Sequence, residues 1–490
     1  MAASIATLLY AALILGLFWL DRDRGSRASP ALLIPVTWLA LGGSRSVSEW
    51  LYVTRPGASA EALLEGDPVN RVVYTGLVAM GLAVLLFRGP KVLKLLQANA
   101  VIVVFLLYCA LSLTWADHPD VGFKRWVKTV GDFVMVLIVV SERDPSDAIR
   151  RLFIWTGFLL IPLSMLMIKY YPDLARYYSR FEWATLYSGV TTNKNNLGAI
   201  CMLFGLASAS QFLAALSGRT KTGRGRRLVA HGVILVMVMW LFDLAKSTTS
   251  LMCFFTGIVL LIALEMRAPA TQMGTSAAKE MRKSRLVAEH LLANALVAFL
   301  IVVPAMVLFG GLDGILRMLG KDPTLTDRTL IWELLFELAP NEWVGTGFEN
   351  FWLGPRLDKI WSVYKWAPNQ AHNGYVETFL NLGWIGVALV VAVLANGYRT
   401  VMTGFRRSPI GGLMLTFFVV GVVYNFTEAA LFRMMAPAWV ALLLAITRVP
   451  ELHSSQTWQP PQRHTTERTA RLRGPDKAQG HVVAISGRNA

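Results

Sequence analysis

Charged residues are scarce in this sequence. Asp, Glu, Lys and Arg make up only 16% of the 490 residues, while 54% are hydrophobic, whereas soluble domains carry about 25% charged residues. The mean hydropathy is accordingly positive, at +0.48. A large water-soluble core does not explain this composition, so we expect most of the chain to lie in a membrane.

Cysteine is scarce as well. The three cysteines, Cys109, Cys201 and Cys253, all fall within apolar runs, and their spacing fits neither a disulfide framework nor a metal site. We expect them to be small buried side chains. Features of a cleaved signal peptide are also lacking: residues 4–20 have no basic start and no small-residue cleavage pattern, so we expect this run to be retained.

Long apolar runs, by contrast, recur along the whole chain. About thirteen of them contain roughly 17 residues or more, enough to cross a hydrocarbon layer about 30 Å thick as a helix. They are centred near residues 12, 38, 79, 106, 132, 159, 206, 236, 256, 298, 385, 418 and 440. The pattern predicts an all-α fold, a polytopic bundle of about twelve or thirteen transmembrane helices.

The net charge is strongly positive, at +16, but we do not expect the chain to bind nucleic acid. The basic residues are dispersed over short connections, and no aromatic platform is interleaved with them. These connections are residues 21–27, 88–94, 142–151, 219–227, 267–285 and 398–407. They alternate with less basic connections, so the positive-inside rule places them in the cytoplasm. Thirteen spans then put the N-terminus outside and the C-terminal tail inside.

Two long segments interrupt the pattern of spans. Residues 448–490 are rich in Pro, Gln, Thr, Arg and Gly, so we expect a disordered, basic cytoplasmic tail after a membrane domain of residues 1–447. Residues 311–372 are instead rich in Trp, Phe, Leu and Pro. We expect this large loop to fold against the outer face of the membrane, and loops of this length are usually functional.

Polar residues next to the spans lie on the outer side of the membrane in this topology. Placing a polar residue in or beside a span costs free energy, so such residues are functional candidates by default. Glu428 and Arg433 lie there, between the last two spans. Three stretches stand out on the same side. They are GVTTNKNNLG at residues 189–198, the segment 324–352 in which Arg328 opens a short helix and Gly345-Thr346-Gly347 makes a turn, and AHNGYVETFLNLGWIG at residues 371–386.

These stretches resemble the O-antigen ligase and polymerase family of bacterial membrane proteins, and within it the succinoglycan-type exopolysaccharide polymerases. The resemblance covers roughly residues 100–447. It is carried by Lys194-Asn195-Asn196-Leu197-Gly198, by Asp327-Arg328-x-x-x-Trp332 followed by Gly345-x-Gly347, and by His372-Asn373-x-Tyr375-x-Glu377.

The resemblance implies a GT-C-like glycosyltransferase of the bacterial inner membrane, with a large periplasmic loop and an active site that faces the periplasm. The donor would be a glycan on undecaprenyl pyrophosphate, and an acceptor hydroxyl would attack its anomeric carbon with inversion. Neither a metal nor a cofactor is implied. The implied partners are the lipid-linked oligosaccharide, the acceptor glycan and the lipid bilayer, together with chain-length regulator and export proteins.

Such a reaction needs cations around the leaving pyrophosphate, because they stabilise the charge that develops as the glycosidic bond breaks. Arg328, Lys194 and Arg180 are the candidates. Many relatives carry an arginine shortly before the Asn-rich stretch, whereas the nearest one here is Arg180. Lys194 is therefore an alternative for that position.

The acceptor hydroxyl needs a base that works near neutral pH, and His372 is the candidate. We expect Asn373 and Asn195 to orient sugar hydroxyls. Glu377, about one helical turn after His372, is expected to hold the histidine in its productive tautomer.

Several of these residues also have a structural interpretation. Thr192, Asn193 and Asn195 could cap the helix that follows, and Lys194 could extend to the lipid headgroups. The tryptophans of the large loop could form an interfacial belt or stack on sugar rings. Asp132, near the centre of a span, should have a buried polar partner or be protonated.

Three functions remain open. A polymerase is favoured over a ligase that transfers glycan to lipid A core, because NKNNLG and HNGYVE are more similar to the exopolysaccharide subgroup. A transporter or flippase for a lipid-linked sugar is the third. It is disfavoured because the two halves show no clear repeat and because, apart from Asp132, the ionisable residues sit at the outer edge of the spans.

Overall fold

The computed structural model describes residues 2–23, 28–51, 67–179, 184–218, 223–265, 328–364, 366–405 and 408–450, with the side chains of residues 179, 265 and 328–330 left out. All of these belong to one structural unit, Met1–His453. Several predicted features lie outside the described residues. They are the apolar run near residue 298, residues 311–327 of the large loop, Arg180, and the tail beyond residue 450.

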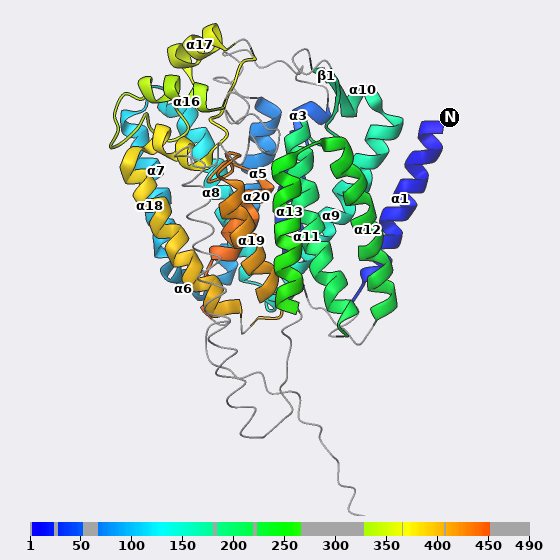
Figure 1. Ribbon diagram of the computed structural model, residues 1–490. Coiled ribbons are helices and arrows are strands. Elements are labelled where there is room, and N and C mark those ends of the chain that lie inside the picture. The colour runs from blue at the N-terminus through cyan, green and yellow to red at the C-terminus, as the bar shows by residue number, and fades with distance from the viewer. Residues whose placement is uncertain are drawn as a thin grey trace, which may run out of the picture. The chain divides into compact units, whose positions relative to one another are not determined.

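Helices make up nearly all of the described structure (Figure 1). They are α1 (Ala2–Asp21), α2 (Leu33–Gly42), α3 (Val47–Trp50), α5 (Pro68–Arg88), α6 (Pro90–Ala98), α7 (Ala100–Leu111), α8 (Pro119–Val140), α9 (Pro145–Tyr170), α10 (Pro172–Ala175), α11 (Lys194–Leu216), α12 (Arg224–Ala245), α13 (Thr248–Glu265), α16 (Arg328–Glu337), α17 (Gly354–Val363), α18 (Gly374–Phe405), α19 (Gly411–Tyr424) and α20 (Pro437–Ile446). Twelve of the predicted apolar runs have their centres in these helices. The prediction of an all-α polytopic membrane protein is confirmed.

The helices vary in length more than the sequence predicts. Six described helices are long and apolar enough to cross a membrane, namely α1, α5, α9, α11, α12 and α18, and there is a seventh if α6 and the helix after it, bent by 82°, form one span. The apolar helices α2, α13, α19 and α20 are shorter. Several expected spans are thus short helices, because non-helical connections such as residues 425–436 take up part of their apolar runs.

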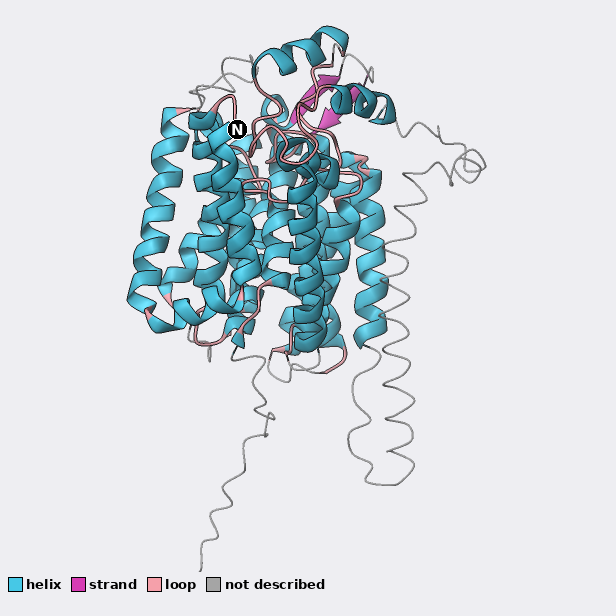
Figure 2. Cartoon of the chain, turned by 90° about the vertical axis from the view of Figure 1, so that its left-hand side faces the viewer, coloured by secondary structure: helices cyan, strands magenta, loops and turns pink. Residues whose placement is uncertain are grey.

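The irregular structure gathers at one end of the helices. In Figure 1, α16, α17, α10 and a small β-hairpin lie at this end, which we call the loop end, and α6 lies at the opposite end. Figure 2 shows the strands of the hairpin beside the loops there. β1 (Arg176–Ser179) and β2 (Ala184–Tyr187) pair antiparallel. The sequence did not predict them, because strands of four residues give too short an alternation to recognise.

Helix α18 is broken at Gly383, where φ is +63°. The backbone freed by the break bonds to the large loop instead: the Trp384 N–H donates to the Glu342 carbonyl at 2.8 Å and the Ile385 N–H to the Trp343 carbonyl at 3.1 Å. A Cβ at position 383 would lie 2.2 Å from the Trp343 carbonyl carbon. Gly345, at φ +65°, makes the turn that the sequence predicts next to this junction.

The connection between α19 and α20, residues 425–436, is non-helical and is held by α8. Asp132 of α8 accepts hydrogen bonds from the indole Nε1 of Trp38 at 2.7 Å and from the Met435 N–H at 3.1 Å. The expectation that Asp132 has buried polar partners is confirmed. The two contacts join α2, α8 and the connection before α20.

The break in α18 leads to a stability prediction. Gly383→Ala should lower the free energy of unfolding by roughly 1–3 kcal/mol, because the alanine would be held at a positive φ against the Trp343 backbone. Thermal unfolding of the purified protein in detergent measures this. Gly76→Ala is the control: Gly76 is also inside a helix, but apart from its chain neighbours and the backbone of that helix no described atom lies within 4 Å of the position of its Cβ. Equal melting temperatures for the two variants would contradict the role given to Gly383.

Candidate active site

His372 lies directly before α18 and contacts a carboxylate from a distant part of the chain. Its backbone is left-handed, at φ +53°, and its Nδ1 lies 3.4 Å from Oε2 of Glu428 in the connection before α20. Both side chains are largely shielded, with exposed fractions of 17% for His372 and 9% for Glu428. Within the described residues, no group of three or more His, Cys, Asp or Glu side chains is placed to hold a metal ion.

The same carboxylate reaches the Asn-rich stretch. Asn195, in the first turn of α11, donates from Nδ2 to Oε1 of Glu428 at 3.2 Å. Glu428 therefore connects the starts of α11 and α18. The sequence placed both stretches on one side of the membrane, and the structure brings the two side chains to one carboxylate.

The segment 324–352 contacts the loop of His372 through a tryptophan. Trp332 of α16 donates its indole N–H to the Ala371 carbonyl at 2.8 Å, immediately before His372. Arg328 begins α16 four residues earlier. The side chain of Arg328 lies outside the description, as does the whole of Arg180, so their roles stay predictions.

Glu377 contacts the scaffold around His372 instead of His372 itself. Its carboxylate accepts from the indole Nε1 of Trp352, at 2.9 and 3.0 Å to its two oxygens, and from the Ala371 N–H at 2.5 Å. The carboxylate within reach of the imidazole is that of Glu428. The expected contact between Glu377 and His372 is therefore replaced by one with Glu428, and Glu377 supports the loop that carries the histidine.

Asn373 is also part of the scaffold. Its Oδ1 accepts from the N–H groups of Tyr375 and Val376, at 2.9 and 3.1 Å, which caps the start of α18, and its Nδ2 donates to the Phe426 carbonyl at 3.2 Å. The residue is 1% exposed. These contacts give Asn373 a structural role, and its expected contact with a sugar hydroxyl stays a prediction.

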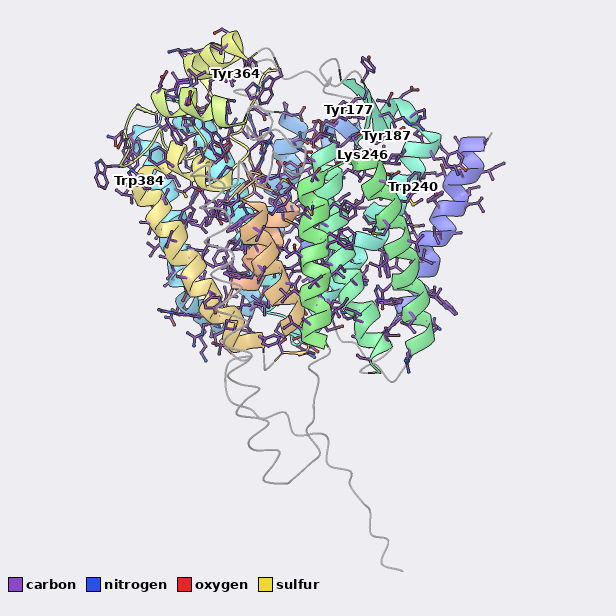
Figure 3. The ribbon with its side chains drawn as sticks, in the orientation of Figure 1. Tyr177, Tyr187, Trp240, Lys246, Tyr364 and Trp384 are labelled. Carbon is purple, nitrogen blue, oxygen red and sulfur yellow. The ribbon has the colours of Figure 1, made fainter. Side chains whose placement is uncertain are left out.

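Lys194 is the first residue of α11, and Asn193 caps that helix by accepting from the Asn196 N–H at 2.9 Å. The capping interpretation is thus confirmed for Asn193. The backbone N–H of Lys194 donates to the Tyr177 hydroxyl at 3.2 Å, and Figure 3 shows Tyr177 on the hairpin at the loop end. The hairpin therefore braces the Asn-rich stretch. The side chain of Lys194 is partly exposed, and its role stays a prediction.

Basic side chains lie next to the His372–Glu428 pair. Arg433 donates to Oε1 of Gln370, and Nε2 of Gln370 lies 3.3 Å from Nδ1 of His372. The positive charges of Arg433 and Arg125, the latter on α8, also repel each other.

The basic cluster continues along α8 towards α5. Lys128, one turn after Arg125, interacts electrostatically with Arg125 and Arg71. Arg125 donates to the Glu349 carbonyl at 2.7 Å, and the Glu349 carboxylate is 3.7 Å away. We refer to Arg71, Arg125, Lys128 and Arg433 as the basic cluster. The sequence marks Arg433 as a functional candidate, but Arg71, Arg125 and Lys128 are not among the predicted site residues. The bases at the start of the predicted span in α8 are themselves a signal, because charge is costly there.

Two comparisons bear on the identity of the chain. No protein-family model matches it. It is similar to the exopolysaccharide production protein ExoQ of Rhizobium meliloti (strain 1021), with 24% identity over 336 residues that cover 67% of this chain and 71% of that protein. This distant similarity supports a relation to exopolysaccharide production and agrees with the resemblance to the O-antigen ligase and polymerase family; the succinoglycan-type subgroup stays a prediction.

Proposed function

We propose that this protein polymerises exopolysaccharide repeat units by glycosyl transfer from an undecaprenyl-pyrophosphate-linked donor to an acceptor glycan hydroxyl. In this proposal the reaction takes place on the periplasmic face of the bacterial inner membrane. The observation that carries it is the His372–Glu428 pair beside Arg433 of the basic cluster, a base next to cations. The similarity to an exopolysaccharide production protein favours this substrate class.

The histidine acts as the general base. With the Nδ1–H donated to Glu428, the lone pair of His372 Nε2 is left to accept the proton of the acceptor hydroxyl. The hydroxyl oxygen then bonds to the anomeric carbon of the donor. The bond from that carbon to the pyrophosphate oxygen breaks, and undecaprenyl pyrophosphate leaves with the electron pair. A single displacement of this kind inverts the anomeric configuration.

The basic cluster stabilises the leaving pyrophosphate. The positive charges of the cluster repel one another, most strongly where Arg125 and Lys128 are partly removed from water, and a bound anion relieves that repulsion. Fixed positive charges also act most strongly where negative charge develops in the transition state. Arg433 is connected to the histidine through Gln370. The predicted cations Arg328, Lys194 and Arg180 complete the proposal.

A ligase that transfers glycan to lipid A core would use the same base and cations with another acceptor. The comparison with an exopolysaccharide production protein favours the polymerase. An extension assay distinguishes the two, because a polymerase lengthens lipid-linked chains without added lipid A core.

Substitutions of the base and its partner test the mechanism. His372→Ala should lower the rate of chain extension by roughly 10²–10⁴-fold, the usual contribution of a general base, and Glu428→Gln should lower it by less. The measurement is extension of an undecaprenyl-pyrophosphate oligosaccharide by the purified, folded protein. Glu333→Gln, at an exposed position on α16, is the control and should keep the full rate. Wild-type protein that moves the lipid-linked oligosaccharide across vesicle membranes without extending it would contradict the proposal.

Substitutions in the basic cluster test the pyrophosphate contact. Arg433→Gln should lower kcat by roughly 10²-fold or more, and Lys128→Gln should raise the KM for the lipid-linked donor. Lys124→Gln is the matched control on α8, because Lys124 is exposed and pairs with Asp120 at 3.4 Å. Steady-state kinetics against donor concentration provide both constants. If Arg433→Gln and Lys124→Gln behave alike, the cluster does not bind the donor.

The periplasmic orientation can be tested in whole cells. Cys109, Cys201 and Cys253 are buried, so a single added cysteine should give a readable signal. Asn196→Cys, exposed at the start of α11, should react with a membrane-impermeant maleimide added outside spheroplasts, whereas Lys94→Cys, exposed on α6 at the opposite end, should not. The reverse pattern would place the candidate site in the cytoplasm.

A further inference from the structure

Trp366 lies beside the candidate base on a closed turn. The Ala367 N–H donates to the Tyr364 carbonyl at 3.0 Å, and Ala367 has a φ of +52°. The indole ring of Trp366 is 40% exposed. Its centroid lies 6.3 Å from that of the His372 imidazole, and the two ring planes are tilted by 35°.

The loop that carries Trp366 is fixed on both sides. Before the turn, Trp361 donates its indole N–H to the Pro368 carbonyl at 2.8 Å. After it, Ala371 is held through its carbonyl by Trp332 and through its N–H by Glu377. A large apolar ring is thus kept partly in water beside hydrogen-bonded backbone, although burial would stabilise it.

Trp366 differs from its neighbouring tryptophans. Trp332, Trp352 and Trp361 donate their indole N–H groups to other parts of the protein. In the described part of the chain, no hydrogen bond involves the indole N–H of Trp366.

Two of the other exposed tryptophans lie at the break in α18. Trp343 is 68% exposed and Trp384 is 51% exposed. Figure 3 shows Trp384 on the side of α18 away from α19, and Trp343 adjoins it at the break in α18. This location is typical of an interfacial belt.

We infer that Trp366 is a stacking platform for a pyranose ring of the acceptor glycan. This inference rests on the proposed function and adds a sugar subsite to it. The C–H face of a pyranose packs on the flat face of the indole, while the free N–H can donate to a sugar hydroxyl. A sugar held there lies beside the imidazole of His372, so one of its hydroxyls is presented to the base. Trp366 is then a positioning residue for the acceptor.

Two measurements test the platform separately from the reaction. The first is binding of a lipid-free repeat-unit oligosaccharide, released from the source strain's exopolysaccharide by mild acid, to the purified protein in nanodiscs by isothermal titration calorimetry. The second is the KM for the acceptor against kcat in chain extension. Trp366→Ala should weaken binding and raise this KM by about five- to tenfold with a smaller change in kcat, Trp366→Phe should recover most of the loss, and Trp343→Ala should match the wild type.

Each outcome has one meaning. Unchanged binding and an unchanged KM in Trp366→Ala overturn the platform while chain extension by the wild type still stands. Equal losses in Trp366→Ala and Trp343→Ala also overturn it, because a general effect on packing then explains both. Binding that depends on Trp366 in a wild-type protein that extends no chain supports the subsite and refutes the polymerase.

Discussion

Backbone groups that leave a helix within an apolar bundle must find partners inside the protein, because the hydrocarbon layer offers none. The candidate site depends on how this chain meets that constraint at residues 425–436. Asp132 accepts from the Met435 N–H, and Asn425 accepts from the N–H groups of Ala430 and Leu431 at 2.8 and 2.7 Å. With its backbone bonded at both ends, the connection holds Glu428 and Arg433 in place.

The same solution recurs around the break in α18. Asn381 accepts from the N–H groups of Asn350 and Phe351, at 3.0 and 3.1 Å, and Asn373 caps the start of the helix. An asparagine suits both positions because its amide supplies an acceptor and a donor without a charge. Asn373, Asn381 and Asn425 are therefore scaffold, whereas Asn195 donates to Glu428, the carboxylate beside the candidate base. Fixed loops of this kind pre-organise a site before substrate binds.

The sequence predicted the membrane bundle well because helix length and apolar composition are imposed by the bilayer, whatever the tertiary packing. It could not predict which runs would be shortened by connections such as residues 425–436, since this depends on contacts with Asp132, far away in the chain. The partner of His372 shows the same limit. Glu377 is near in sequence, but His372 has a left-handed backbone before α18 begins, so helical spacing does not apply, and the carboxylate comes from Glu428. Asn193 could be predicted as a cap because capping is local.

Gln370 contacts both the candidate base, His372, and Arg433 of the basic cluster. Its Oε1 accepts from Arg433, and its Nε2 lies 3.3 Å from the same His372 Nδ1 that faces Glu428. Nδ1 can donate to Glu428 or accept from Gln370, but a single tautomer cannot do both. Only the tautomer that donates to Glu428 leaves Nε2 free as a base. In the proposed mechanism, an anion that draws Arg433 away from Gln370 also removes the restraint on the Gln370 amide, which weakens the competing contact and favours the productive tautomer. Donor binding and activation of the base are coupled through Gln370 in that mechanism.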